Sequence, residues 1–173
     1  DETSKVLNDQ GWFNTGDLGM LLPSGELVLT GRSKDTIVLT NGENIEPGPL
    51  EEFLVSSPLL EQVMVIGQDE KQLGALLVPN VDAMEKWLKI SGLSLVNEDG
   101  VYSVDLSLTN LLRREINRLL SMRPGSRSEE KVGGVALVQP FTIENGLLTQ
   151  TLKQKRKSIR KRDAKSIGLI YGN

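Results

Sequence analysis

The sequence contains no cysteine and no histidine, and only 4% of its 173 residues are aromatic. The absence of cysteine excludes disulfide bonds and thiol chemistry, and it fits a reducing compartment. The absence of both residue types also excludes a Ser–His or Cys–His nucleophile and an ordinary zinc site. The chemistry of the chain must therefore rest on Lys, Arg, Asp, Glu and backbone groups.

Long apolar runs are also absent. The longest, such as LGALLVP from Leu73, are far shorter than the ~20 residues that a membrane-spanning helix needs. The first residues show no basic segment followed by an apolar one, so no secretory signal is visible. With 38% apolar and 25% charged residues, the chain is predicted to be soluble and to bury one ordinary core.

Charge is distributed unevenly along the chain. The net charge is −3, yet residues 153–165 hold eight basic residues and a single acid, Asp163. A solvated helical face is the simpler interpretation of such a run, and a site for a polyanion is the alternative. The choice depends on whether the run begins at a lysine with a chemical role.

Two strand-like runs, at residues 19–22 and 26–30, are joined by a Pro-Ser-Gly turn near the start of the chain. Two strands alone are marginally stable in water. We therefore expect residues 1–33 to be the end of a larger domain and the native protein to continue upstream.

A β-hairpin is predicted from Thr36 to Ile45. Its Asn41-Gly42 tip favours a type I′ turn, which requires φ > 0 at both central residues. The glycine at the tip would also let the backbone come close to another molecule. An Ile-Glu-Pro sequence then opens a helix.

The rest of the chain alternates between helical and strand-like patterns. Apolar spacing and turn residues predict a helix from Pro47 to Ser56, antiparallel strands at 62–67 and 73–79, a short helix at 82–90, a loop at 91–105, a helix at 106–122, a strand at 132–139 and a basic carboxyl-terminal helix. This order predicts an α+β fold in which a small three-stranded sheet is packed with helices and preceded by a β-hairpin.

Three motifs in this order resemble the carboxyl-terminal part of the adenylate-forming enzymes, the superfamily of acyl-CoA synthetases, luciferases and peptide-synthetase adenylation domains. They are TGD at 15–17, GRSKDTIVLTNGENIEP at 31–47 and TQTLKQKR at 149–156. The third matches a T-x-S-G-K-x-x-R pattern in spacing, with Leu152 in place of the glycine. The segments GWFNTGDLG and ENGLLTQTLKQKR are most similar to those of the long-chain acyl synthetases, especially the cyanobacterial and plastid acyl carrier protein ligases.

The resemblance implies a domain division and a hinge. Residues 1–33 would end a large N-terminal AMP-binding domain, and residues 34–173 would form a mobile C-terminal domain, here called the lid, with its hinge at Lys34. Asp17 and Arg32 would bind the ribose of ATP or of the acyl-adenylate. Gly42 would line the approach of the acceptor thiol.

The resemblance also implies a catalytic lysine, Lys153, with Lys155 as the alternative. When a fatty carboxylate attacks the α-phosphate of ATP, two anions must approach each other. A fixed ammonium that contacts both lowers this barrier.

The reaction implied is the ATP-dependent activation of a long-chain fatty acid, followed by acyl transfer to the pantetheine thiol of CoA or of an acyl carrier protein. The cofactors would be ATP and Mg²⁺, with the magnesium ligand upstream of residue 1 and no metal ligand in this chain. The partners would be the fatty acid, CoA or carrier protein, and the N-terminal domain of the same chain, with a peripheral membrane contact possible and nucleic acid excluded. The expected location is the cytoplasm or the plastid stroma, and the isolated chain is expected to be inactive.

A second interpretation does not use the resemblance. Asp17 would be a turn carboxylate, Arg32 a residue at a strand end, Lys34 a surface cation, and the chain an α+β binding module. Its basic carboxyl-terminal helix would then hold nucleic acid or an anionic membrane. The lack of aromatic residues within the basic run argues against nucleic acid.

Overall fold

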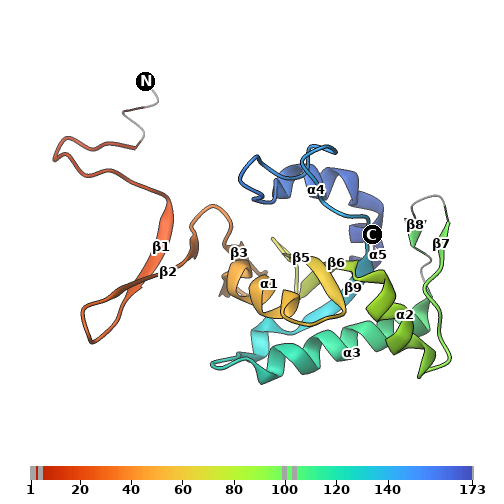
Figure 1. The fold of residues 1–173 in the computed structure, drawn as a ribbon. Coiled ribbons are helices and arrows are strands. Elements are labelled where there is room, and N and C mark those ends of the chain that lie inside the picture. Colours follow the sequence, from red (N-terminus) through yellow and green to blue (C-terminus); the bar gives the residue numbers. More distant parts are fainter. Residues whose placement is uncertain (1–2, 4–5, 99–100, 103–104, 173) are drawn as a thin grey trace.

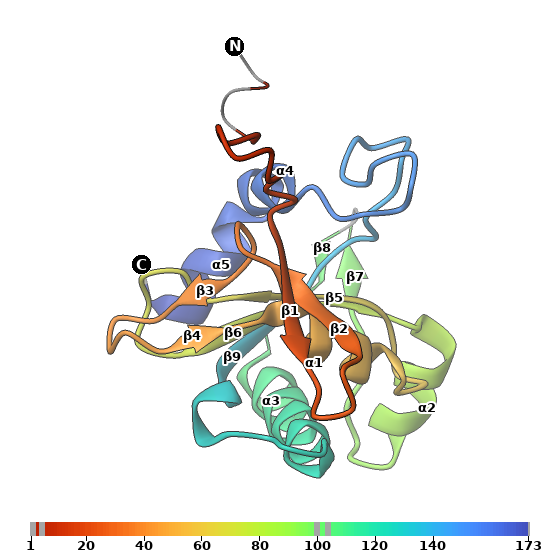
Figure 2. The same ribbon diagram turned by 90° about the vertical axis from the view of Figure 1, so that its left-hand side faces the viewer.

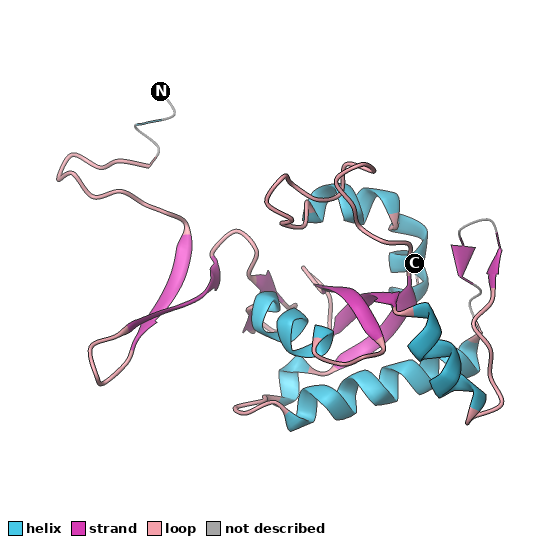
Figure 3. Cartoon of the chain, in the orientation of Figure 1, coloured by secondary structure: helices cyan, strands magenta, loops and turns pink. Residues whose placement is uncertain are grey.

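The computed structural model describes residues 3, 6–98, 101–102 and 105–172, and it shows an α+β architecture built on a three-stranded sheet (Figures 1 and 3). The strand order is β5-β6-β9, with β5 at Leu60–Ile66, β6 at Leu73–Pro79 and β9 at Val132–Leu137. Strands β5 and β6 are antiparallel, whereas β6 and β9 are parallel. The predicted α+β class and the three-stranded sheet with packed helices are confirmed.

The central strand, β6, is buried along its whole length. Its sequence LGALLVP is continuously apolar because helices cover the sheet on both faces. Parallel pairing of β6 with β9 requires a long connection. This connection contains α2 (Val81–Lys89) and α3 (Leu106–Met122).

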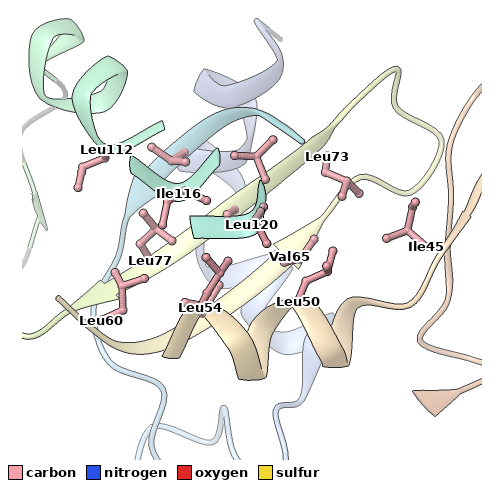
Figure 4. Packing of buried hydrophobic residues seen from close by; sticks show 14 of the residues in the cluster. Ile45, Leu50, Leu54, Leu60, Val65, Leu73, Leu77, Leu112, Ile116 and Leu120 are labelled. Carbon is pink, nitrogen blue, oxygen red and sulfur yellow. The ribbon is translucent and has the colours of Figure 1, made fainter. Parts of the chain in front are cut away.

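The first face of the sheet is covered by α1 (Pro47–Val55) and α3, and their apolar side chains interdigitate with those of the strands (Figure 4). The helix predicted at 106–122 has the bounds of α3. Four side chains spaced three or four residues apart form its buried stripe, namely Leu108, Leu112, Ile116 and Leu120. The Asp105 carboxylate caps the helix by accepting a hydrogen bond from the Ser107 backbone N–H at 2.6 Å.

The opposite face of the sheet is covered by α4 (Arg156–Arg162) and α5 (Ala164–Tyr171) (Figure 1). Helix α5 packs where Gly74 of β6 and Gly134 of β9 lie side by side in register. A Cβ atom at Gly74 would come within 2.9 Å of both Ile170 and the Tyr171 hydroxyl. The two glycines therefore provide the space in which α5 lies.

Strands β1 (Asp17–Leu21) and β2 (Leu27–Arg32) form a separate two-stranded sheet that projects away from the other elements (Figure 1) and faces the viewer in Figure 2. Three of the four leucines of these strands are largely exposed, with Leu21 at 70%, Leu27 at 67% and Leu29 at 68%, whereas Leu18 is partly buried. These two strands therefore bury little apolar surface against the described residues.

The hairpin of β3 (Ile37–Val38) and β4 (Asn44–Ile45) is present, but the predicted type I′ turn is wrong. Gly42 has φ +85°, whereas Asn41 is not among the described residues with positive φ. The Gly42 N–H donates to the Leu39 carbonyl at 2.9 Å, and the Asn41 side chain accepts from the Glu43 N–H at 3.1 Å. A five-residue loop thus needs the left-handed conformation only at Gly42.

Two other predictions need correction. The segment predicted as a loop at 91–105 contains two short paired strands, β7 (Asn97–Glu98) and β8 (Val101–Tyr102). The basic carboxyl-terminal helix is two helices, because Asp163, with φ −97° and ψ 21°, interrupts it between α4 and α5. A short 3-10 helix, η2 (Ser128–Glu130), precedes β9. Among the described residues, no helix has the length and apolar character required to span a bilayer.

Candidate functional site

Asp17 and Arg32 lie opposite each other in the register of β1 and β2. The Arg32 Nε is 3.3 Å from the Asp17 Oδ1, and the side chains are 56% and 32% exposed. A pair this open contributes little to stability. It leaves carboxylate lone pairs and guanidinium N–H groups available to a polar ligand such as a ribose.

Lys34 lies in the turn that connects β2 to β3, with its side chain exposed. The turn closes when the Asp35 N–H donates to the Arg32 carbonyl at 2.9 Å, and it is held to β1 by the Ser33 N–H, which donates to the Gly16 carbonyl at 2.9 Å. Within the described part of the chain, no hydrogen bond or ion pair holds Lys34 itself. The predicted hinge residue thus lies in a short hydrogen-bonded turn and makes no side-chain bond of its own to the described residues.

Glu46 contacts residues on both sides of this turn. In the sequence it belongs only to the Ile-Glu-Pro that opens a helix. Its Oε1 accepts a hydrogen bond from the Thr36 hydroxyl at 2.7 Å. Its Oε2 faces Gly31 so closely that a Cβ there would lie 2.5 Å from the oxygen. The glycine of the Gly-Arg pair therefore makes room for the Glu46 carboxylate.

Lys153 lies at the end of a tight turn between Leu148 and Gln154, which form an isolated antiparallel bridge. The Thr149 N–H donates to the Lys153 carbonyl at 2.9 Å, and the Lys153 N–H donates to the Thr149 hydroxyl at 3.0 Å. The backbone is therefore fixed. The Lys153 side chain is exposed, and its ammonium has no hydrogen bond or ion pair among the described residues.

Leu152 adopts φ +59°, a left-handed conformation that glycine favours. This is the position at which the family pattern has glycine. The side chain is 68% exposed, so it gains little from burial. The turn before Lys153 therefore has the backbone shape that a glycine would adopt, at a cost of about 1 kcal/mol in strain.

We expect Leu152→Gly to raise the free energy of unfolding by about 0.5 kcal/mol. The strain energy relieved in the folded state should exceed the free energy by which the greater conformational entropy of glycine stabilises the unfolded chain. Urea denaturation measures the change. The exposed neighbour Gln150 serves as the control, because Gln150→Gly lacks this compensation and should destabilise the chain. Equal destabilisation by both substitutions would contradict this account of the turn.

Arg156 anchors the chain directly after the Lys153 turn. Its Nη1 lies 2.8 Å from the Glu51 carboxylate of α1, and its Nη2 donates to the Val65 carbonyl at the outer edge of β5. The same Glu51 oxygen accepts from the Val65 N–H at 2.7 Å. The two charged side chains are only 19% and 15% exposed. In the sequence, Arg156 is one of the basic residues of the tail, and only its place three residues after Lys153 in the motif distinguishes it.

A groove of about 620 Å³ lies between the β2–β3 turn and the start of α4. It brings together Lys34 and Lys155, the alternative catalytic lysine, together with Arg156. Lys153, Gly42 and the Asp17–Arg32 pair are not part of its lining. Within the described residues, no hydrogen bond or ion pair joins Lys153 to the predicted ribose-binding pair of Asp17 and Arg32.

Gly42 is exposed at the tip of the β3–β4 loop, and no atom lies within 4 Å of the position of a Cβ there. The loop is held to the β5–β6 connection, because the Thr40 N–H donates to the Glu70 carbonyl at 2.9 Å and the Val38 N–H donates to the Gln68 side chain at 3.1 Å. The hairpin is therefore anchored while its tip stays open.

Glu130 anchors the other side of this hairpin. Its carboxylate, 8% exposed, pairs with Arg123 and lies 3.3 Å from the Arg127 Nε. Arg127 also donates to the Asn44 carbonyl of β4 at 3.1 Å. Burial acts to raise the pKa of Glu130, but hydrogen bonds from the Arg127 backbone and the Arg123 guanidinium outweigh it and lower the pKa below 4.5.

A carboxylate with a lowered pKa stabilises the fold at pH values above its ordinary pKa, and this contribution is lost as the pH falls through the lowered value. We expect Glu130→Gln to reduce the free energy of unfolding at pH 7 by about 2 kcal/mol. The deficit relative to the unaltered chain should shrink below pH 4.5. Urea titrations between pH 7 and pH 3 measure it, with the exposed Glu85→Gln as control. A deficit that does not change with pH would contradict the assignment.

Within the described residues, no group of three or more Asp or Glu side chains is placed so that it could hold a metal ion. The chemistry available here is that of exposed cations on a fixed backbone, the open Asp17–Arg32 pair and an open glycine tip.

Comparison with known proteins shows what the chain is similar to. Residues 34–92 match the family described as AMP-binding enzyme C-terminal domain. The chain is also similar to the A domain of a carboxylic acid reductase from Segniliparus rugosus, which was solved with AMP and a carboxylic acid. The two are 25% identical and superpose with a TM-score of 0.80, over 99% of this chain and 25% of the reductase chain. Residues 34–92 therefore match the C-terminal domain of the AMP-binding enzymes, and the chain as a whole is similar to part of an adenylation domain.

Over nearly its whole length the chain is similar to ligases of long-chain fatty acids. It is 38% identical to the probable acyl-activating enzyme 16, chloroplastic, of Arabidopsis thaliana, and 37% identical to the long-chain-fatty-acid–[acyl-carrier-protein] ligase AEE15, chloroplastic, of the same plant. It is 32% identical to the long-chain-fatty-acid–CoA ligase 6 of Mus musculus. These alignments cover 98%, 98% and 99% of the chain but only 24%, 22% and 24% of the relatives, so the chain spans about a quarter of their length.

Proposed function

We propose that the chain is the lid of an ATP-dependent ligase that activates a long-chain fatty acid as acyl-adenylate and transfers the acyl group to a pantetheine thiol. One observation carries the proposal: the Lys153 side chain is free and exposed on a turn whose backbone is held by Thr149, a left-handed Leu152 and the Arg156 anchor. A loop built in this way presents one ammonium group at a defined position.

The lid would begin at Lys34, with residues 1–33 belonging to the N-terminal domain. Three observations support this division. The family match starts at residue 34. Lys34 makes no hydrogen bond or ion pair within the described residues, and the projecting β1–β2 sheet leaves most of its leucines exposed. These leucines would pack against the N-terminal domain, and the lid would rotate about Lys34.

In the first half-reaction, Asp17 would accept hydrogen bonds from the ribose hydroxyls of ATP, and Arg32 would bind beside it. In its first orientation, before the lid rotates, the lid would hold the Lys153 ammonium between the fatty carboxylate and the α-phosphate. The fixed positive charge would offset the repulsion of the two anions while pyrophosphate leaves in line. Magnesium would supply further charge neutralisation from ligands outside this chain.

In the second half-reaction, the lid would turn the β3–β4 hairpin toward the adenylate. Gly42 has no side chain and no neighbour over its open face, so a narrow pantetheine arm could pass along it. The thiol sulfur would attack the acyl carbonyl, and AMP would leave. The relatives' names include both carrier-protein and CoA ligases, and the acceptor proposed for this chain is the carrier protein.

The test is to assay the full-length protein with palmitate and ATP. We expect palmitate-dependent ATP–pyrophosphate exchange, and palmitoyl transfer to carrier protein with CoA offered as the competing acceptor. Absence of palmitate-dependent exchange under any acceptor condition would overturn the proposed function. Transfer to CoA alone would overturn only the choice of acceptor.

A further inference from the structure

The basic run at the carboxyl end separates into residues that the fold uses and residues that it leaves free. Arg156 pairs with Glu51, and Arg162 pairs with Asp163 at 2.8 Å while donating to the Gln139 and Pro140 carbonyls. The other six basic residues make no side-chain hydrogen bond or ion pair within the described part of the chain, and all are exposed: Lys153, Lys155, Lys157, Arg160, Lys161 and Lys165. The chain as a whole has a net charge of −3, so these free cations form a local concentration of positive charge.

Three of the free cations, Lys157, Arg160 and Lys161, are spaced i, i+3 and i+4 on α4 and therefore share one face of the helix. We name them the α4 cationic face. Ile159, which is fully buried, seats the helix against the sheet. Like charges at i and i+4 destabilise a helix by a few tenths of a kcal/mol. No acidic side chain pairs with this face within the described residues, so its charge is left for an external partner.

The groove between α4 and the β2–β3 turn adjoins this face. Lys34, Lys155, Lys157 and Arg160 all contribute to its lining, and Asp35 is the single acidic residue among the residues that line it. Cations from two segments far apart in the sequence therefore surround one hollow of about 620 Å³. Low-dielectric walls lined by charge of one sign focus the electrostatic potential and attract a partner of opposite sign.

We propose that the α4 cationic face docks the acidic surface of the carrier protein that accepts the acyl group. This inference rests on the proposed function and adds a partner surface to it. Acyl carrier proteins are acidic, so their charge complements this face. An anionic membrane fits less well, because Ile159 of α4 is buried and the face offers no apolar side chain to insert. Nucleic acid fits less well because residues 153–165 include no aromatic side chain to stack on bases.

Charge reversal in the full-length enzyme tests the docking surface. The variant Lys157→Glu, Arg160→Glu, Lys161→Glu should raise the KM for carrier protein about 10-fold or more, because like charges would then face each other. The KM of the unaltered enzyme for carrier protein should rise with salt, because salt screens the attraction. The KM of the variant should not rise with salt, because salt then screens a repulsion. Palmitate-dependent ATP–pyrophosphate exchange and transfer to free pantetheine should stay unchanged, because both avoid the docking contact.

Two further variants make the result decisive. Lys86→Glu, Lys89→Glu, Arg114→Glu reverses three exposed charges on α2 and α3, away from the groove, and should leave the KM for carrier protein unchanged. The milder Lys157→Gln, Arg160→Gln, Lys161→Gln should raise this KM by a smaller factor and provides the test if charge reversal impairs folding. An unchanged KM in the α4 variants would overturn the proposal, as would an equal rise in both triple reversals. Loss of binding to phosphatidylserine vesicles or to DNA, with carrier kinetics intact, would also overturn it. Failure of pyrophosphate exchange in the unaltered enzyme would instead refute the proposed function.

Discussion

Replacing Lys153 by alanine in the full-length enzyme should slow acyl-adenylate formation by a factor on the order of 10² to 10³, the usual loss when one charge-stabilising donor is removed. The fold should be unaffected, with the free energy of unfolding changed by less than about 0.5 kcal/mol. The reason is that the exposed ammonium makes no contact within the described residues, so its removal leaves no buried group without a partner. Palmitate-dependent ATP–pyrophosphate exchange measures the loss.

Lys155 provides the matched control for this experiment. Its backbone N–H donates to the Leu147 carbonyl at 2.8 Å, and its side chain is exposed like that of Lys153. We expect Lys155→Ala to retain exchange within about threefold, as is usual for surface substitutions. Retained exchange in Lys153→Ala together with loss in Lys155→Ala would transfer the catalytic role to Lys155.

The substitution Arg156→Gln is expected to have the largest effect on stability, lowering the free energy of unfolding by about 3 kcal/mol. It would leave the Glu51 carboxylate largely buried without its cationic partner and the Val65 carbonyl without its donor. Arg156→Lys keeps the charge but lacks the planar guanidinium whose N–H groups contact both acceptors, so it should retain only part of the stability that Arg156→Gln loses. Urea denaturation of the 173-residue chain measures both.

The exposed Arg114 is the control for Arg156, because it has no ion pair within the described residues, and Arg114→Gln should change stability by less than about 0.5 kcal/mol. In the full-length enzyme, Arg156→Lys should also slow adenylation, because the turn that carries Lys153 would lose part of its anchor. A loss of stability in Arg156→Gln no larger than that in Arg114→Gln would show that the buried pair does not anchor the turn.

Much of the fold could be predicted because its long elements carry strong patterns. The leucine stripe of α3 fixed a helix at 106–122, and the unbroken apolar run at 73–79 indicated a buried strand. The remaining errors have local causes. Strands β7 and β8 have two residues each, too few to show a period. The break at Asp163 falls within a charged run whose side chains carry no apolar period.

For the candidate site, the sequence pattern indicates candidate residues but not their arrangement. Motif spacing selected Lys153, although the conformation of Leu152 contradicts what a leucine prefers and could not be inferred from its type. The Asn41-Gly42 pair shows the same limit. Asn-Gly is compatible with a two-residue type I′ turn and with a wider loop, and the wider loop is the one that forms here. The anchoring role of Arg156 depends on Glu51, which lies 105 positions earlier in the chain. No local pattern joins two such residues.

The central claim is that one lid serves two half-reactions by rotating at Lys34. The most direct test is Lys34→Pro in the full-length enzyme, with each half-reaction measured separately, because proline fixes φ at the proposed pivot. We predict that ATP–pyrophosphate exchange stays within about threefold while transfer from supplied palmitoyl-adenylate to carrier protein falls on the order of 10²-fold, as expected when a lid is misplaced. Unchanged rates in both half-reactions would contradict rotation about Lys34.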